Sequence, residues 1–556
     1  MNKYLYNNIL LTVSSLCLII FVLIFYGLIP LGSPNTLGIF LPQIGLINCF
    51  DLKSFSCPNI GIGTNFIEYQ SVPFALIYSL LKSKYLTPEI YWSLFTMFLV
   101  IIAFIFSFKI AKSLRINKYL SIIFAFSYLL SLQVVSKVGY VYLFHSAMML
   151  PVSIFLDLRI LRKLNYSNVF LSLLFKLVFI FTDMYIFFIS FLFSIAVFIA
   201  HPKITKKIKV FCILLGGIFS FFFQKSAWRS PYEFFVGQGI DLKHLLIRTS
   251  ISKDYKLAYS SDGESIANAF LGYQFIIVLV LILLFFRKIR LLKLKIIIFT
   301  ILVSLLLSMG PHLKIDSKRE ITQVENINFN FYLHPQENTI SKLPHFFIYE
   351  NFFPFHQMRS VSRWTIITVF FSNLIFFFFL NYFIKIKFYL ILLLCVPFIN
   401  MNLDIIKKIK INNEISNQYK NFKRELFLSG GENIFYKKKV LFTYYRNEFF
   451  STFFCSFMQC LTPMKSGDKN LAKLRKANSI IEFSELEEND YLSNLLTNKV
   501  VDLIFVPHFD LRWDTYAWPN LKKPKINQDD LNKIDFFKSK NYKVNKFNFY
   551  TVISLR

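Results

Sequence analysis

Residues 91–110 read YWSLFTMFLVIIAFIFSFKI, an apolar and aromatic run in which Lys109 is the one charged residue. An α-helix of about twenty residues is about 30 Å long, which matches the hydrocarbon core of a bilayer. Comparable runs recur until about residue 403. The sequence therefore predicts a mainly α-helical fold, a polytopic transmembrane helical bundle over residues 1–403.

Eleven runs in all are predicted as membrane spans. They are Leu10–Pro30, Tyr91–Ile110, Tyr119–Val135, Tyr140–Leu156, Val169–Thr182, Met184–Ala200, Val210–Phe223, Phe275–Phe286, Ile296–Met309, Trp364–Phe383 and Phe388–Asn400. The first run is longer than the core of a signal peptide and lacks a convincing cleavage site, so we interpret it as an uncleaved anchor.

The composition supports a membrane protein. The 556 residues are 55% hydrophobic and include 69 Phe, and 17% are charged, which is too apolar for a soluble domain. The net charge of +30 is compatible with nucleic acid as a partner. However, the chain has no zinc-finger spacing, basic helix or RNA-binding signature, so no nucleic acid is expected.

Lysine and arginine concentrate in alternate loops. The clusters are Lys109/Lys112/Arg115/Lys118, Arg159/Arg162/Lys163, Lys203/Lys206/Lys207/Lys209, Arg287/Lys288/Arg290/Lys293/Lys295 and Lys385/Lys387. Short cytoplasmic loops hold such clusters, so the N-terminus is predicted to be cytoplasmic. The long segments 32–89, 224–274 and 310–363 then lie outside. After an odd number of spans, so does the C-terminus.

The segment Val72–Leu86 is apolar but is interrupted by Lys82 and Lys84. It is predicted to lie along the outer interface as an amphipathic helix. The alternative is a twelfth span, which would place the C-terminus in the cytoplasm.

From Asp404 onward the residues become more polar. The runs Val440–Tyr445, Val501–Val506 and Phe547–Leu555 are typical of strands, and Tyr491–Asn498 is typical of a helix. We predict a small extracytoplasmic α/β domain over residues 404–556.

Two close cysteine pairs lie in polar segments on the predicted outer side, Cys49 with Cys57 and Cys455 with Cys460. Such pairs suit disulfides in an oxidising compartment. Without a histidine partner or a Cys-x-x-Cys motif, zinc is the weaker interpretation.

Charged residues at or near the spans are candidates for function. Lys176 and Asp183 are seven residues apart on one predicted helix, which favours either a polar cleft or a snorkelling lysine beside a helix-end carboxylate. Arg359 and Arg363 would share a helix face at the outer end of the tenth span and suit a bound phosphate, or else would anchor the helix at the interface. His356 lies beside them. Asp51 and Glu68 in the first outer loop are candidate general bases.

Several motifs resemble the GT-C superfamily of bacterial membrane glycosyltransferases, in particular its YfhO-like branch. They are Ser71–Leu76, His145 with Pro151, Glu264–Tyr273, Ser308–Pro311 and Pro354–Arg363. The resemblance covers roughly residues 1–400 and rests on their order and spacing. It implies a bacterial cytoplasmic membrane protein that moves a sugar from a polyprenyl-phosphate donor to an envelope glycan or lipid.

The resemblance implies a base from the first outer loop, for which Glu68 and Asp51 are the candidates, and Asp183 is a further catalytic candidate because of its charge near a span. Arg359, Arg363 and His356 are candidates for the lipid phosphate, and Glu264 and His145, which lie in the matching motifs, are candidates for substrate contacts. A divalent cation is compatible with it. The family's early catalytic carboxylate has no counterpart, because Gly32 to Cys49 contains no Asp or Glu. A polysaccharide polymerase or flippase and a noncatalytic envelope assembly protein therefore remain alternatives.

Overall fold

The computed structural model of the chain describes residues 3–26, 28, 56–57, 64–65, 72–81, 86, 88–135, 137, 141–180, 182–201, 232–246, 271–285, 291–317, 320–323, 330–351, 360–383, 439–442, 459–461, 489–499, 501–508, 534, 537–538, 542–548 and 550–556.

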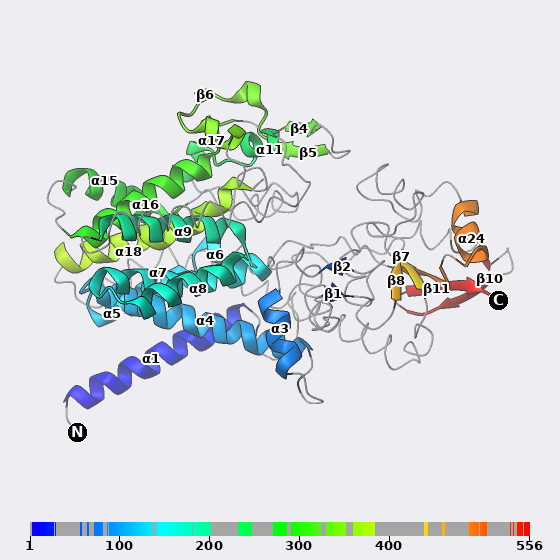
Figure 1. Cartoon of the computed structure of the whole chain (residues 1–556), viewed down its shortest axis with the longest axis horizontal. Coiled ribbons are helices and arrows are strands. Elements are labelled where there is room, and N and C mark those ends of the chain that lie inside the picture. Colours follow the sequence, from blue (N-terminus) through cyan, green and yellow to red (C-terminus); the bar gives the residue numbers. More distant parts are fainter. Residues whose placement is uncertain are drawn as a thin grey trace.

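A bundle of helices makes up most of the described chain, which confirms the prediction of a mainly helical fold (Figure 1). Its members are α1 (Lys3–Phe25), α4 (Pro88–Ser113), α5 (Lys118–Leu129), α6 (Leu132–Val135), α7 (Val141–Arg162), α8 (Tyr166–Ile180), α9 (Met184–Ala200), α15 (Tyr273–Phe285), α16 (Leu292–Met309), the short 3-10 helix η6 (Val361–Trp364) and α18 (Thr365–Phe383). Central α7 packs against α4, α8 and α9, and α18 packs against α5, α15 and α16.

Four of these helical segments are long and apolar enough to cross a bilayer: Ile90–Ser113, Leu143–Arg162, Leu292–Met309 and Val361–Tyr382. Five further apolar helices are shorter, among them Lys118–Leu129 and Gln274–Phe285. The predicted spans Val210–Phe223 and Phe388–Asn400 lie outside the described residues. The structure thus supports several membrane helices, and the number of eleven remains a prediction.

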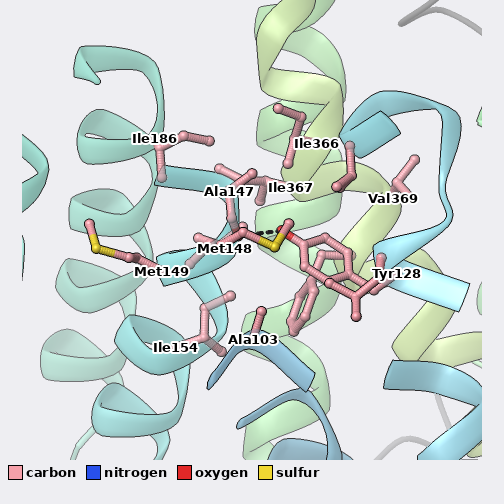
Figure 2. Packing of buried hydrophobic residues seen from close by; sticks show 14 of the residues in the cluster. Ala103, Tyr128, Ala147, Met148, Met149, Ile154, Ile186, Ile366, Ile367 and Val369 are labelled. Atoms are coloured by element: carbon pink, nitrogen blue, oxygen red, sulfur yellow. Dashed lines mark hydrogen bonds between the residues drawn. The ribbon is translucent and has the colours of Figure 1, made fainter. Parts of the chain in front are cut away.

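Part of the bundle core, with side chains from α4, α5, α7, α9 and α18, is drawn in Figure 2. The Tyr128 hydroxyl on α5 donates a hydrogen bond of 2.7 Å to the backbone oxygen of Ala147 on α7. Around it pack Ala103 of α4, Ile186 of α9 and, from α18, Ile366, Ile367 and Val369. A buried tyrosine hydroxyl needs such a partner, so this bond fixes α5 against α7 as well as completing the core.

Basic loops that are distant in the sequence gather at one end of the bundle. Lys109 of α4 lies 6.0 Å from the ring centre of Phe155 on α7. Arg162, at the end of α7, interacts electrostatically with Lys293 at the start of α16. We call the region around these three cations the basic end. The loop pattern predicts that it faces the cytoplasm.

The opposite end of α16 carries a small extramembrane-type substructure, which we call the cap: residues 232–246 and 310–351 (Figure 1). It contains α11 (Tyr232–Gly237), α12 (Leu242–Leu246), β3 (His312–Leu313), β4 (Glu320–Gln323), β5 (Asn330–Leu333), η4 (Gln336–Asn338), β6 (Ser341–Lys342) and α17 (Phe346–Asn351). Strands β3 and β6 pair antiparallel, as do β4 and β5.

Two polar side chains hold the cap together. The Asp241 carboxylate accepts hydrogen bonds from the backbone N–H groups of Lys243, Asp316 and Ser317. The buried Lys314 ammonium donates to backbone oxygens that include that of Met309, the last residue of α16. A cation there satisfies an orphan carbonyl and complements the negative end of the helix dipole.

Glycines let the cap approach α16 at backbone distance. Gly310 ends α16 with φ 76° and ψ −168°, a conformation that is essentially restricted to glycine. A Cβ on Gly239 would lie 2.1 Å from the backbone oxygen of Met309, and one on Gly310 would lie 2.4 Å from that of Phe235. Larger residues at either position would force the cap away from the helix.

The short helix α3 (Val72–Leu81) covers part of the predicted interfacial segment. Phe74, Ala75 and Tyr78 are buried against the bundle, whereas Leu80 and Leu81 are exposed. Its ten residues are about 15 Å long, half of a hydrocarbon core. The described helix is therefore too short for the alternative of a twelfth span.

Near the C-terminus lies a five-stranded mixed sheet in the order β10-β11-β9-β7-β8. Its strands are β7 (Lys439–Phe442), β8 (Gln459–Leu461), β9 (Leu503–Pro507), β10 (Tyr542–Lys546) and β11 (Tyr550–Leu555), and α24 (Asn489–Thr497) precedes β9. Strand β7 is parallel to β8 and β9, while β11 is antiparallel to β9 and β10. Parallel strands with a helix between them agree with the predicted α/β character.

Candidate functional site

Tyr185 is the centre of a polar and aromatic cluster at the end of the bundle where α9 begins and α18 begins. Its hydroxyl accepts a hydrogen bond of 2.7 Å from the Ser360 backbone N–H. Its backbone oxygen accepts one of 3.2 Å from the Trp364 indole N–H. The two bonds join the start of α9 to η6. They thereby fix the position of Arg363, which lies between Ser360 and Trp364.

Arg363 is buried, and its guanidinium carbon lies 5.2 Å from the centre of the Tyr185 ring. This is cation–π geometry, and a desolvated pair of this kind contributes about 2 kcal/mol. Guanidinium groups stack well on aromatic rings and keep their charge under all physiological conditions. The arrangement holds a permanent cation at a fixed place near the mouth of the bundle.

Asp183 precedes the same tyrosine by two residues. Its Oδ1 atom accepts a hydrogen bond of 2.9 Å from the Ile186 N–H, so Asp183 is the N-cap of α9. Aspartate is among the best residues at this position, which explains why the helix begins here. The positive end of the helix dipole favours the ionised carboxylate.

Two further contacts extend the cluster to α7 and to the cap. The Ser146 hydroxyl of α7 donates a hydrogen bond of 2.9 Å to that of Thr182. The Ser360 hydroxyl donates one of 2.6 Å to the side-chain oxygen of Gln238, which follows α11. We call the whole group the Tyr185 cluster: Ser146, Thr182, Asp183, Tyr185, Gln238, Ser360, Arg363 and Trp364.

His145, next to Ser146 in the chain, is fully buried. Aromatic rings enclose it, with ring centres at 4.7 Å for Trp92, 4.8 Å for Phe74 and 5.8 Å for Phe95. Its Nε2 atom is 2.9 Å from the Thr96 hydroxyl. In this structure His145 is a core residue, and the substrate contact implied by the family resemblance remains a prediction.

The structure corrects the expected placement of Lys176 and Asp183 on one face of one helix. Helix α8 ends at Ile180 and Asp183 caps the next helix, so the two residues are not on one helix face. Lys176 instead pairs with Asp157 of α7, at 3.0 Å between Nζ and Oδ2. The predicted fourth span ended at Leu156, one residue short of this partner.

The predicted shared helix face of Arg359 and Arg363 remains a prediction, because only the Arg363 side of it is described. Ser360 has φ −95° and ψ 69°, which is not helical, and the 3-10 helix begins only at Val361. Arg359 itself lies outside the described residues, as do His356, Glu68, Asp51 and Glu264. Of the predicted site residues, the structure places Arg363 against the Tyr185 ring and Asp183 at the N-cap of the helix that carries Tyr185, while His145 precedes Ser146, which bonds to Thr182.

Sequence reasoning missed Tyr185, which stacks on Arg363, and Gln238, which bonds to Ser360. Both are neutral, and neither breaks an apolar pattern, so no sequence signal marked them. In the described part of the chain, no group of three or more His, Cys, Asp or Glu side chains is arranged to hold a metal ion.

Comparison with known proteins adds no family. No family model, no curated protein and no solved structure matches the chain. The arguments about function therefore rest on the residues themselves and on the resemblance noted from the sequence.

Proposed function

We propose that the chain transfers a sugar from a polyprenyl-phosphate-linked donor to a glycan or glycolipid of the cell envelope, at the end of the bundle opposite the basic end. The observation that carries the proposal is that Arg363 stacks on the ring of Tyr185, two residues after Asp183, the carboxylate that caps α9. A cation for the phosphate and a carboxylate for the acceptor hydroxyl are the two groups that such a transfer needs.

The proposed role of Arg363 is to hold the lipid phosphate. A guanidinium group can donate two parallel hydrogen bonds to phosphate oxygens, which an ammonium cannot. Its place above the Tyr185 ring orients the group and lowers the entropic cost of binding. In the proposed topology this arginine lies on the outer side, where positive charge is otherwise depleted.

The proposed role of Asp183 is that of general base. It would take the proton from the acceptor hydroxyl as that oxygen attacks the sugar carbon and the carrier phosphate leaves. The positive end of the α9 dipole favours negative charge at this position. Glu68 and Asp51, from the loop 32–89, are the other proposed candidates for this role.

Two substitutions test the proposal with the full chain in nanodiscs. Arg363→Lys keeps the positive charge but loses the two parallel N–H donors of the guanidinium group. We expect binding of a fluorescent polyprenyl phosphate to weaken about tenfold, equivalent to about 1.4 kcal/mol. Arg162→Lys, at the basic end, is the matched control and should bind like the parent chain. Equal binding by Arg363→Lys and the parent would reject the phosphate site.

Asp183→Asn separates binding from transfer. Asparagine caps a helix as well as aspartate does, so α9 should remain intact. We expect unchanged carrier binding and loss of sugar transfer from a radiolabelled polyprenyl-phosphate sugar. If transfer persists, the base lies elsewhere, with Glu68→Gln as the next variant.

A second candidate is a noncatalytic assembly protein that binds lipid-linked glycans. The observation in its favour is that Asp183 already serves α9 as a cap, so its presence has a structural explanation. Carrier binding that depends on Arg363, together with no transfer by the parent chain, would support this second function.

A further inference from the structure

Three neighbouring side chains of the cap carry buried polar atoms that have no hydrogen-bond partner in the described part of the chain. The atoms are the Tyr232 hydroxyl, His312 Nε2 and His345 Nε2. A buried polar atom left unpaired costs about 1–3 kcal/mol, so such atoms are rare in folded proteins. These three atoms belong to aromatic side chains of the cap and call for a common explanation, while Ser317 Oγ is a further unpaired buried atom of the cap.

The three residues come from separate cap elements but lie in one neighbourhood. The Tyr232 and His312 rings are 6.0 Å apart between centres. The His345 and Tyr349 rings are 5.9 Å apart, and Tyr349 interacts electrostatically with Tyr232. His312 itself is 3% exposed, so its unpaired nitrogen points into the cap and not to solvent.

The hydrogen bonds around His312 define which of its nitrogens carries the proton. The Thr339 hydroxyl has one hydrogen, which it donates to the backbone oxygen of Gln336 at 2.7 Å. The same hydroxyl lies 2.9 Å from His312 Nδ1, so it must accept there and Nδ1 must be the donor. In a neutral ring, the unpaired Nε2 is then a bare hydrogen-bond acceptor.

The same reasoning applies to His345. Backbone oxygens of Leu306 and Gly310 accept hydrogen bonds from its ring. Since Nε2 has no hydrogen-bond partner among the described residues, we assign the ring proton to Nδ1. His345 therefore also presents a bare acceptor nitrogen, while the Tyr232 hydroxyl can both donate and accept.

Both rings are neutral near pH 7. Burial, with the nearby Lys314 and Lys342 ammonium groups, lowers the pKa of His312 to about 4, and burial lowers the pKa of His345. Burial and then the Glu350 carboxylate raise the pKa of Tyr232 to about 12, so its hydroxyl stays protonated.

These charges select the kind of ligand that would complete the hydrogen bonds. Lys314 and Lys342, whose charges disfavour a protonated His312, also repel a metal ion or an ammonium group. The Glu350 carboxylate beside Tyr232 repels an anion such as phosphate. A neutral molecule that carries several hydroxyl groups can donate to bare nitrogens and can both donate to and accept from the Tyr232 hydroxyl, and the Tyr232 and Phe235 rings supply apolar surface for its C–H groups.

We propose that the cap contains a binding site for an uncharged saccharide, in which sugar hydroxyls donate to His312 Nε2 and His345 Nε2 and pair with the Tyr232 hydroxyl. This inference extends the proposed function, on which its biological meaning rests, since Tyr349 interacts electrostatically with Tyr185 as well as with Tyr232. The binding itself requires no transfer. Access requires the cap to open beside its half-buried members, Tyr232 and His345.

The test uses the full chain in nanodiscs prepared without sugar-headed detergents, because these would occupy the site. Saturation-transfer NMR with free glucose, galactose, mannose and N-acetylglucosamine should detect at least one ligand. Tyr232→Phe and His312→Phe should each weaken that binding about tenfold, the change expected for one lost hydrogen bond of about 1.4 kcal/mol. Tyr119→Phe, at the start of α5, is the matched control and should bind like the parent chain.

The melting temperature of Tyr232→Phe distinguishes a binding role of the hydroxyl from a structural one, because loss of a structural hydrogen bond would lower it. Since the substitution removes an unpaired buried hydroxyl, the melting temperature should equal or exceed that of the parent chain. Binding of none of the sugars, or equal binding by Tyr232→Phe, overturns the inference. Carrier binding that depends on Arg363 would then still stand, so the failure of this site and of the proposed function can be told apart.

Discussion

Lys176 Nζ lies 3.0 Å from Asp157 Oδ2, and both side chains are buried where α7, α8 and α9 meet. Three hydroxyl groups complete the network. Ser172 and Ser194 donate to the carboxylate, and Ser153 accepts from the ammonium at 2.9 Å. Each of the three helices contributes at least one polar group, so the ion pair joins them inside an otherwise apolar bundle.

We expect removal of one partner to be more damaging than removal of both. Lys176→Met leaves a buried carboxylate unpaired and should cost about 3–5 kcal/mol of unfolding free energy. The double variant Lys176→Met/Asp157→Leu should recover most of that loss. Unfolding of the purified chain in mixed micelles measures both values, and additive losses would show that the pair is not coupled.

The exposed ion pair between Lys243 and Asp316 in the cap is the natural control. Solvent screens this pair, so Lys243→Met should change the unfolding free energy by at most about 1 kcal/mol.

Tyr185→Phe should separate the hydroxyl from the ring. The substitution keeps the surface against which Arg363 stacks but leaves the Ser360 N–H without its acceptor, which should cost about 1–3 kcal/mol. Carrier binding should weaken, because Ser360 and Arg363 lie in one short segment. Unfolding and polyprenyl phosphate binding measure the two effects, and a variant as stable as the parent would contradict the assigned bond.

The cap should lose stability as the pH falls from about 6.5 to about 4. The folded state holds the pKa of His312 at about 4, below the ordinary value of 6.5, so the unfolded state binds more protons in that interval. Unfolding free energy then rises with pH through this window and levels off above it. Melting curves of the parent chain should show this slope, and those of His312→Phe should be flatter. Tyr232→Phe, which does not titrate there, should keep the parent's slope.

The C-terminus is predicted to lie outside the cytoplasm. A reporter that is active only outside the cytoplasm, fused after Arg556, should be active, and the same reporter fused after Arg162, at the basic end, should be silent. The reverse pattern would invert the proposed topology and move the Tyr185 cluster to the cytoplasmic side.

The two cysteine pairs offer an independent check of the same topology. Cys57 lies in the short strand β1 (Ser56–Cys57) and Cys460 in β8, while Cys49 and Cys455 lie outside the described residues. We expect disulfides Cys49–Cys57 and Cys455–Cys460, so that alkylation labels these thiols only after reduction. Labelling of all four in the untreated native chain would refute the pairing.

The sequence predicted the helices well where an apolar run was long and uninterrupted. Residues 91–110 fall entirely within α4, and Met184–Ala200 matches α9. It failed at breaks between runs. The predicted helix from Tyr119 to Val135 is two helices, because the chain turns at Leu130 and Ser131, and neither residue is a strong breaker.

The candidate site was partly predictable for a physical reason. Asp183 and Arg363 are charged residues at the ends of apolar runs. Because burying a charge there is energetically costly, such residues can be recognised as candidates from sequence alone. Their common neighbour Tyr185 and the partnership of Lys176 with Asp157 depend on which helices pack together. That information lies in long-range packing and not in local periodicity.

The close approach of Gly239 and Gly310 has a mechanical consequence. At these glycines the backbone of the cap lies directly against the backbone of the last turn of α16. The Lys314 ammonium also donates a hydrogen bond to the backbone oxygen of Met309 in that turn. We therefore expect α16, from the basic end to its last turn, to move together with the cap as one rigid body. The described junction contains no hinge. A tilt of α16 within the bilayer would therefore also displace His312 and His345 of the cap.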